Sequence, residues 1–168
     1  EDFALLMDMV RNEGQPFTAM MVGRAAAGKG FILPERMYPV MATPQVINAP
    51  DPAFVLAITR QESSFDPRAR SPADARGMMM LLPSTARIVA RQMGVPFEEG
   101  RLYEASYNME LGAYHLGDLL GKVSGSYILT AAGYNAGPGR PARWIGECGD
   151  PRSSFTDPVD FIECVPFT

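Results

Sequence analysis

The stretch FVLAITRQESSFDP, residues 54–67, decides how this chain folds. Its larger apolar residues recur at close to helical spacing, which predicts a helix with one face in a core. These residues are Phe54, Val55, Ile58 and Phe65. Asp51 followed by Pro52 provides an N-cap and a first-turn proline, and the helix is expected to stop before Asp66 and Pro67, because the residue before proline is pushed out of the α region.

Glu62 falls in the last turn of this predicted helix. A carboxylate there meets the negative end of the helix dipole, which disfavours its ionised form. Burial by neighbours such as Phe65 would raise the pKa of Glu62 in the same direction, as a general acid working near neutral pH requires. The competing interpretation is a solvated surface charge, which is the usual state of a helical Glu. Position in the helix alone leaves both interpretations open.

Composition and charge exclude several classes of protein. A chain of 168 residues with 46% hydrophobic and 20% charged residues is long and apolar enough for one globular domain. A net charge of −4 without a basic stripe argues against a nucleic-acid partner. There is no apolar run of membrane-spanning length and no signal-peptide pattern at the start. Because the chain starts with Glu1, we expect a processed protein or a fragment.

The periodicity of the remaining chain predicts an all-α fold. Two short helices separated by a polar break at residues 12–16 form a hairpin over residues 1–32, and the domain boundary is placed near residue 33. Five prolines between 34 and 52 exclude any long helix there. Further helices are expected at 83–94, 105–122, 127–134 and 140–145, with a loop at 95–104.

The cysteines and the histidine give no metal or cofactor signal. Cys148 and Cys164 form a disulfide if the compartment is oxidising, and two buried thiols are the alternative. His115 is the only histidine and lies on an amphipathic helix, so we assign it no role. The glycine-rich turn after residue 134 lacks the Lys-Ser/Thr of a phosphate-binding loop. The ring of Trp144 is expected in a core.

Three motifs occur in a fixed order: ES at 62–63, SPADARGMMMLLPSTA at 71–86 and YNAG at 134–137. This order resembles the soluble lytic transglycosylases, which are lysozyme-like enzymes that cut bacterial cell-wall glycan. The resemblance implies a lysozyme-like domain of the goose-type class over residues 33–168, truncated at its C-terminus. Residues 1–32 resemble the last helix pair of the superhelix that precedes this domain in larger members, and an ordinary N-terminal hairpin is the alternative.

The resemblance also assigns roles to residues. It makes Glu62 the catalytic acid and base, and Tyr134 the residue whose hydroxyl holds that carboxyl in place. Ser71 matches a serine that forms a hydrogen bond near the glutamate, although a serine before proline also simply starts a turn. Asn135 braces the glycine-rich turn, and Glu163 is the nearest acid at the C-terminal end of the cleft.

The segment GMMMLL at 77–82 departs from the family pattern. Met80 stands where the family has a glutamine that binds sugar, and a thioether cannot replace amide hydrogen bonds. Met80 and Leu82 are expected to face the cleft, whereas Met78 and Met79 are expected in the core. We expect weaker substrate binding without loss of the acid. Gly133 also replaces a common alanine of the family.

The implied activity is cleavage of the bond between N-acetylmuramic acid and N-acetylglucosamine with formation of a 1,6-anhydro ring. It uses a single glutamate without metal or cofactor, since the nearest other acid, Asp66, is better placed to cap a loop. A monomer in the bacterial periplasm, with peptidoglycan glycan strands as its partner, follows from the resemblance. The alternatives are a lysozyme-like hydrolase and a glycan-binding or assembly protein that has lost activity.

Overall fold

The computed structural model describes residues 2–166 of the chain. Residues 1, 167 and 168 lie outside the described residues. They are the first residue of the predicted segment 1–32 and the last two of the predicted segment 33–168. Within 2–166 the regular structure is entirely helical, with no β-strand beyond isolated bridges that join Arg76 to Arg70 and to Leu81. The predicted all-α class is therefore confirmed.

Most of the helices begin at a proline or after a capping residue. They are α1 (Asp2–Asn12), α2 (Pro16–Ala27), α3 (Pro34–Met37), α4 (Pro52–Ser63), α5 (Pro83–Met93), the 3-10 helix η1 (Glu99–Tyr103), α6 (Ala105–Lys122), α7 (Tyr127–Ala136), α8 (Arg140–Cys148) and α9 (Pro158–Cys164). A proline occupies the first turn of six of them, where its missing N–H leaves no helical hydrogen bond unmade.

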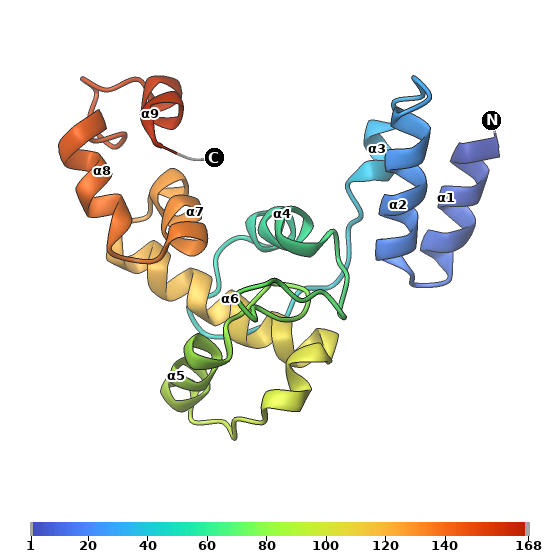
Figure 1. Ribbon diagram of the computed structural model, residues 1–168, viewed down its shortest axis with the longest axis horizontal. Helices are drawn as coiled ribbons and strands as arrows, with labels where there is room; N and C mark the ends of the chain where they lie inside the picture. The colour runs from blue at the N-terminus through green and yellow to red at the C-terminus, as the bar shows by residue number, and fades with distance from the viewer. Residues whose placement is uncertain (1, 167–168) are drawn as a thin grey trace.

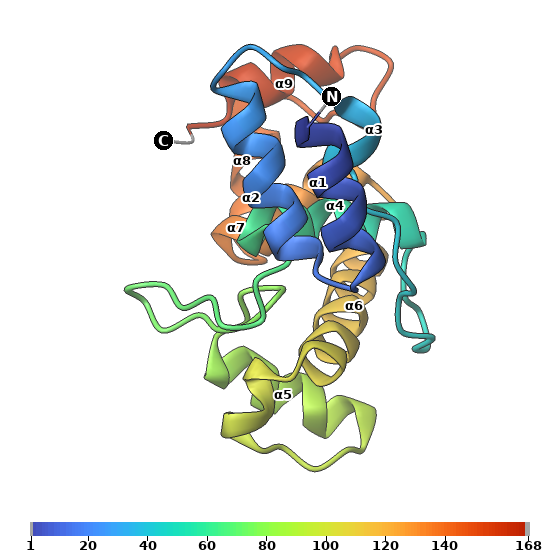
Figure 2. The same ribbon diagram turned by 90° about the vertical axis from the view of Figure 1, so that its right-hand side faces the viewer.

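The long helix α6 lies at the centre of the molecule (Figure 1). Helix α4 packs above it and α5 below it, and the N-terminal hairpin stands to one side while α7, α8 and α9 stand on the other (Figures 1 and 2). The segment before α4 touches α6 closely, because a Cβ on Gly117 would collide with the carbonyl oxygen of Asn48. A glycine on α6 thus lets the chain that leads into α4 lie against the central helix.

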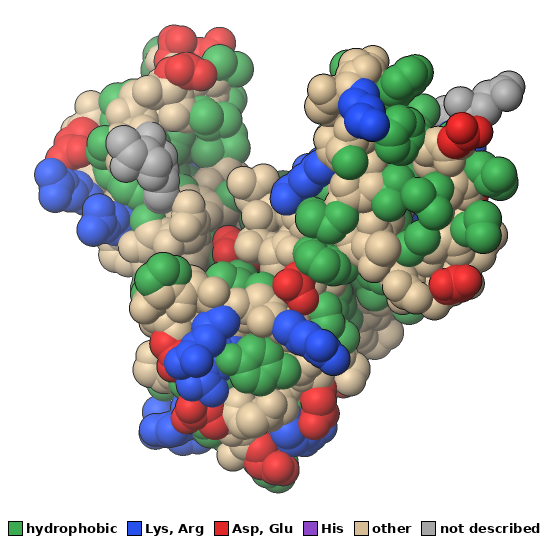
Figure 3. All heavy atoms as spheres, turned by 45° about the vertical axis from the view of Figure 1, so that its right-hand side comes forward, with side chains coloured by type: hydrophobic (Ala, Val, Ile, Leu, Met, Phe, Trp, Pro, Cys, Tyr) green, Lys and Arg blue, Asp and Glu red, His purple; other side chains and the backbone are tan. Residues whose placement is uncertain are grey.

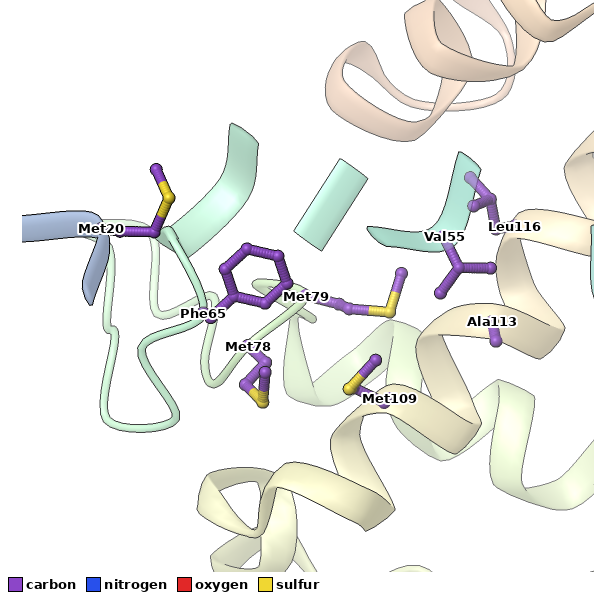
Figure 4. Close-up of a cluster of buried hydrophobic side chains, with 8 residues drawn as sticks. All are labelled: Met20, Val55, Phe65, Met78, Met79, Met109, Ala113 and Leu116. Carbon is purple, nitrogen blue, oxygen red and sulfur yellow. The ribbon is translucent and has the colours of Figure 1, made fainter. Parts of the chain in front are cut away.

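The core around α4 is rich in methionine (Figure 4). Its buried members come from α2, α4, the loop after α4 and α6, and they are Met20, Val55, Phe65, Met78, Met79, Met109, Ala113 and Leu116. Met78 and Met79 are in this core as predicted. Met20 brings the N-terminal hairpin into the same cluster, and the Arg24 guanidinium donates a hydrogen bond to Ser64 Oγ at 2.6 Å. The hairpin is therefore packed against the end of α4.

The C-terminal helices form a separate small core. Leu129, Trp144 and Phe161 are buried together, which confirms the core position expected for Trp144. Cys148 and Cys164 are joined in a disulfide that links the ends of α8 and α9. Figure 3 shows these helices and the N-terminal hairpin as two lobes, separated by a gap above the central body.

Some predicted boundaries were wrong. Helix α4 ends at Ser63, two residues early, because Ser64 and Phe65 both adopt a left-handed backbone that ends the helix and turns Phe65 into the core. The loop at 95–104 contains η1, and α8 runs on to Cys148. Helix α9 was not predicted, although Asp157, whose side chain accepts a hydrogen bond from the Val159 N–H, is a recognisable N-cap.

Candidate active site

Glu62 lies in the last turn of α4, at a helix end that is fixed by several hydrogen bonds. At the other end, Asp51 caps the helix as predicted, because its carboxylate accepts a hydrogen bond of 2.7 Å from the Ala53 N–H. Next to Glu62, the Ser63 hydroxyl donates to the Met78 carbonyl at 2.6 Å and accepts from the Asp66 N–H. The end of α4 is thereby tied to the methionine-rich segment 77–82.

A cavity of about 340 Å³ opens beside Glu62. It lies between α4, the segment 71–82, α5, α6 and α7. Its lining residues are Glu62, Ser71, Ala73, Ala75, Met80, Leu81, Leu82, Thr85, His115, Tyr134 and Asn135. Among these residues Glu62 has the only carboxyl group, so the cavity presents one acid with no second carboxylate opposite it.

Burial raises the pKa of Glu62 above its usual range. Removing a carboxylate from water disfavours its charged form, and no cation of the described residues forms an ion pair with Glu62 to offset this. The direction agrees with the sequence-based expectation for a general acid. A carboxyl that keeps its proton to higher pH can donate it to a bound substrate.

The backbone of Met79 is held at both ends by side chains from the helices behind the cavity. The Tyr134 hydroxyl donates to the Met79 carbonyl at 2.7 Å, and the Asn108 Oδ1 accepts from the Met79 N–H at 2.8 Å. Burial, together with the nearby Glu62 charge, raises the pKa of Tyr134 well above its usual value, so the phenol keeps the proton that it donates. This clamp fixes the next residue, Met80, which has a left-handed backbone with φ of 49°.

The loop that carries Ser71 is closed by its own hydrogen bonds. Ser71 Oγ accepts from the Ala75 N–H at 3.0 Å, and Asp74 forms ion pairs with both Arg70 and Arg76. Ser71 therefore shapes a turn, and it also lines the cavity with Glu62. Arg76 also pairs with Glu99, which attaches this loop to η1.

Comparisons with known proteins agree with this arrangement. The sequence model of the transglycosylase SLT domain matches residues 41–154. The chain belongs to the transglycosylase SLT domain family. A putative soluble lytic murein transglycosylase of Haemophilus influenzae is 42% identical to this SLT domain over 116 residues, which is 68% of this chain and 19% of that protein.

Two solved structures are similar over nearly the whole chain. The 70 kDa soluble lytic transglycosylase of Escherichia coli superposes with a TM-score of 0.84 at 28% identity, covering 98% of this chain and 27% of that one. An inactive Glu-to-Gln variant of the lytic transglycosylase Slt of Pseudomonas aeruginosa superposes with a TM-score of 0.78 at 28% identity, covering 96% of this chain and 26% of that one. The predicted lysozyme-like SLT fold is confirmed, and the chain spans about a quarter or less of these relatives.

The SLT domain brings most of the predicted site residues together. Glu62, Ser71, Met80, Leu82, Tyr134 and Asn135 all line the one cavity. The Tyr134 hydroxyl donates to the Met79 carbonyl, and no hydrogen bond joins it to the Glu62 carboxyl among the described residues. Asp66 accepts from the Arg68 N–H, the loop-capping contact expected of it.

Glu163 is not among the residues that line this cavity. It is exposed on α9, a helix that the disulfide at Cys164 and the buried Phe161 attach to α8. A different cavity lies between α9 and α7, and its lining is mostly apolar, with Tyr127 and Asn135 as its residues that carry polar groups. Glu163, expected from the resemblance as the nearest acid at the C-terminal end of the cleft, is exposed on α9.

His115 lines the site although its sequence position gave it no role. Its ring lies 5.6 Å from the Tyr134 ring, measured between centroids, and burial lowers the pKa of the imidazole. The signal in the sequence was the spacing within α6, since His115 is seven residues after the buried Asn108 and so falls on a neighbouring part of the same face. Thr85, at the start of α5, was also missed.

The described residues give no sign of a metal centre or a membrane span. Within 2–166, no group of three or more His, Cys, Asp or Glu side chains could hold a metal ion. Nor is any helix among these residues long and apolar enough to cross a bilayer.

Proposed function

We propose that this chain is a peptidoglycan lytic transglycosylase, with Glu62 as its sole acid and base. The observation that carries the proposal is the single carboxyl group in the cavity, whose pKa is raised by burial. A glycosidase that uses water or a protein nucleophile generally needs two carboxyl groups across the scissile bond. A cavity with one carboxyl suits a reaction in which the substrate supplies the second functional group.

Protonated Glu62 donates its proton to the glycosidic oxygen between N-acetylmuramic acid and N-acetylglucosamine. The bond from that oxygen to C1 of the muramic residue then breaks, and the 2-acetamido group of the same sugar stabilises the electron-poor C1. Glu62, now a carboxylate, takes the proton of the muramic C6 hydroxyl, whose oxygen attacks C1. The products are a 1,6-anhydromuramic end and a free 4-hydroxyl on the departing sugar.

The surroundings of Glu62 support this sequence of proton transfers. Burial raises the pKa of Glu62, which favours the protonated carboxyl that the first step needs. Met80, Leu81 and Leu82 make one wall of the cavity apolar, and an apolar wall excludes water that would compete with the C6 hydroxyl. The intramolecular hydroxyl then reacts at a high effective concentration.

In this proposal Tyr134 and Ser71 are positioning residues and Asn135 contacts the glycan at the mouth of the cavity. The relatives are named as murein transglycosylases, and one of them is inactive as a Glu-to-Gln variant. Bacterial periplasm is the corresponding location, peptidoglycan strands are the partner, and the chain acts as a monomer.

Mass spectrometry of purified peptidoglycan after incubation with the chain tests the proposal. The unmodified chain should release muropeptides lighter by one water than hydrolysis products, and Glu62→Gln should release none. The exposed residue Glu110 on α6 provides the matched control, since Glu110→Gln makes the same chemical change away from the cavity and should keep full activity. Products with a reducing end would establish a hydrolase, and a chain that binds glycan without releasing product would be a binding protein.

A further inference from the structure

His115 is a polar side chain of the cavity that the proposed mechanism does not use. His115 lines the cavity from α6, and its ring packs beside that of Tyr134. The Tyr134 hydroxyl already donates to the Met79 carbonyl, and Ser71 Oγ already accepts from the Ala75 N–H. Within the described part of the chain, no group forms a hydrogen bond with the His115 imidazole. Its ring nitrogens are therefore available to something else.

The imidazole nitrogens are not fully buried. Among residues 2–166, every fully buried side-chain nitrogen or oxygen has a hydrogen-bond partner. Since the His115 nitrogens have none, they are not sealed in the interior, and the space that His115 lines is this cavity. A half-buried polar group that faces a cavity without a protein partner is suited to bind the molecule that fills it.

The charge state of His115 defines what it recognises. Burial lowers its pKa, and Lys122 on the same helix acts in the same direction while Asp118 acts against it. Glu62 from α4 and Tyr134 from α7 are the other titratable groups that line the cavity, and the raised pKa of each favours its neutral form. A neutral imidazole has one N–H donor and one nitrogen acceptor. A sugar hydroxyl, which both donates and accepts, or an acetamido group, matches this pair.

We propose that His115 is a substrate-binding residue, and that its neutral imidazole forms hydrogen bonds with a hydroxyl or acetamido group of the sugar bound beside Glu62. This inference rests on the proposed function, because it takes the ligand to be an amino-sugar glycan. Residues 80–82, which line the cavity next to it, present only apolar side chains. His115 on α6 thus supplies hydrogen-bonding groups, which the side chains of this wall lack.

The test uses the full chain carrying Glu62→Gln, so that glycan binds without being cut. Its probe is a tetrasaccharide of alternating N-acetylglucosamine and N-acetylmuramic acid. Because the chain contains one histidine, its ¹⁵N-labelled imidazole gives a single set of NMR signals. These signals should shift during the titration and saturate with the dissociation constant that calorimetry measures. Imidazole signals that stay fixed while amides of α4 shift would overturn the inference.

Three variants in the same background separate hydrogen bonding from packing. His115→Phe keeps a ring against Tyr134 and should weaken tetrasaccharide binding about tenfold, the loss expected for one or two neutral hydrogen bonds. His115→Gln restores a donor and an acceptor and should recover most of the affinity, whereas Glu110→Gln on the exposed face of α6 should change nothing. Unchanged affinity in His115→Phe would refute the role of His115. Absence of binding with His115 intact would instead refute the proposed function.

Discussion

Asn108 offers the sharpest test of how the wall of the cavity is held. It is fully buried on α6 and makes three hydrogen bonds to backbone groups. Its Oδ1 accepts from the Met79 N–H at 2.8 Å, and its Nδ2 donates to the carbonyls of Arg76 and Leu102, both at 2.9 Å. Asn108→Ala removes all three partners at once and leaves a small void. The change is therefore expected to destabilise the fold strongly.

The expected loss follows from what each backbone group retains. The Arg76 carbonyl still accepts from the Leu81 N–H, so it loses only a second bond, with a net effect of about 1 kcal/mol. The Met79 N–H and the Leu102 carbonyl each lose the partner that this side chain provided, at about 1 to 2 kcal/mol each when buried. The sum is a loss of about 3 to 5 kcal/mol in the free energy of unfolding. That is a large part of the stability of an ordinary domain.

Urea denaturation followed by circular dichroism measures this loss directly. The control is Glu110→Ala, an exposed change on the same helix, which should stay within about 0.5 kcal/mol of the unmodified chain. A loss below about 1 kcal/mol for Asn108→Ala would show that water or neighbouring groups replace the side chain. In that case the segment 77–82 would not depend on α6 for its position.

Further predictions concern protonation, close packing and the disulfide. Burial raises the folded-state pKa of Glu62, so ionisation of this carboxyl opposes folding. Glu62→Gln should therefore be more stable than the unmodified chain near pH 7, and this gain should vanish as the pH falls below about 4.5. Urea denaturation at a series of pH values measures the difference. For the same reason cleavage of peptidoglycan should fall as pH rises through the raised pKa of Glu62, measured as initial rate against pH. Gly117→Ala should destabilise the fold by about 2 kcal/mol or more, because the added Cβ meets the Asn48 carbonyl. Gly121→Ala on the same helix places its Cβ in open space and should be neutral or stabilising. Equal thermal unfolding temperatures of the two variants would contradict the close contact at Gly117. Reducing Cys148–Cys164, which closes a loop of 16 residues, should destabilise α8 and α9 by about 3 kcal/mol, as seen in unfolding with and without reductant.

The helices were predicted correctly from the sequence where the apolar periodicity agreed with the residues that start and end a helix. Helix α5 begins at Pro83 and ends before Gly94, which adopts the left-handed conformation expected of a C-cap glycine. Helix α4 was placed correctly at its start by Asp51, but its end depends on Ser64 and Phe65. Left-handed backbone at such residues is rare and arises from tertiary packing, so local sequence rules do not predict it.

The site was predictable as a set of positions but not as a set of contacts. Motif order placed Glu62, Tyr134 and Met80 around one cavity, and the structure agrees. The partner of the Tyr134 hydroxyl was not predictable, because it is a backbone carbonyl brought close only by the folded segment 77–82. His115 was missed for a related reason, since the helix it lies on has polar and apolar residues on several faces and only packing selects the one that lines the cavity.

The contacts of the N-terminal hairpin bear on how a minimal fragment of this protein should be cut. The recognisable family segment is 41–154, but Met20 covers Phe65 and Arg24 reaches Ser64 from before it. On the other side, Phe161 belongs to the C-terminal core and Cys164 is joined to Cys148, and both lie beyond the family segment. A fragment trimmed to residues 41–154 would lack the hydrogen bond from Arg24 to Ser64, just after the helix that carries Glu62. It would also leave Cys148 without its disulfide partner. Poor yield or low activity of such a fragment would then be no test of the proposed function.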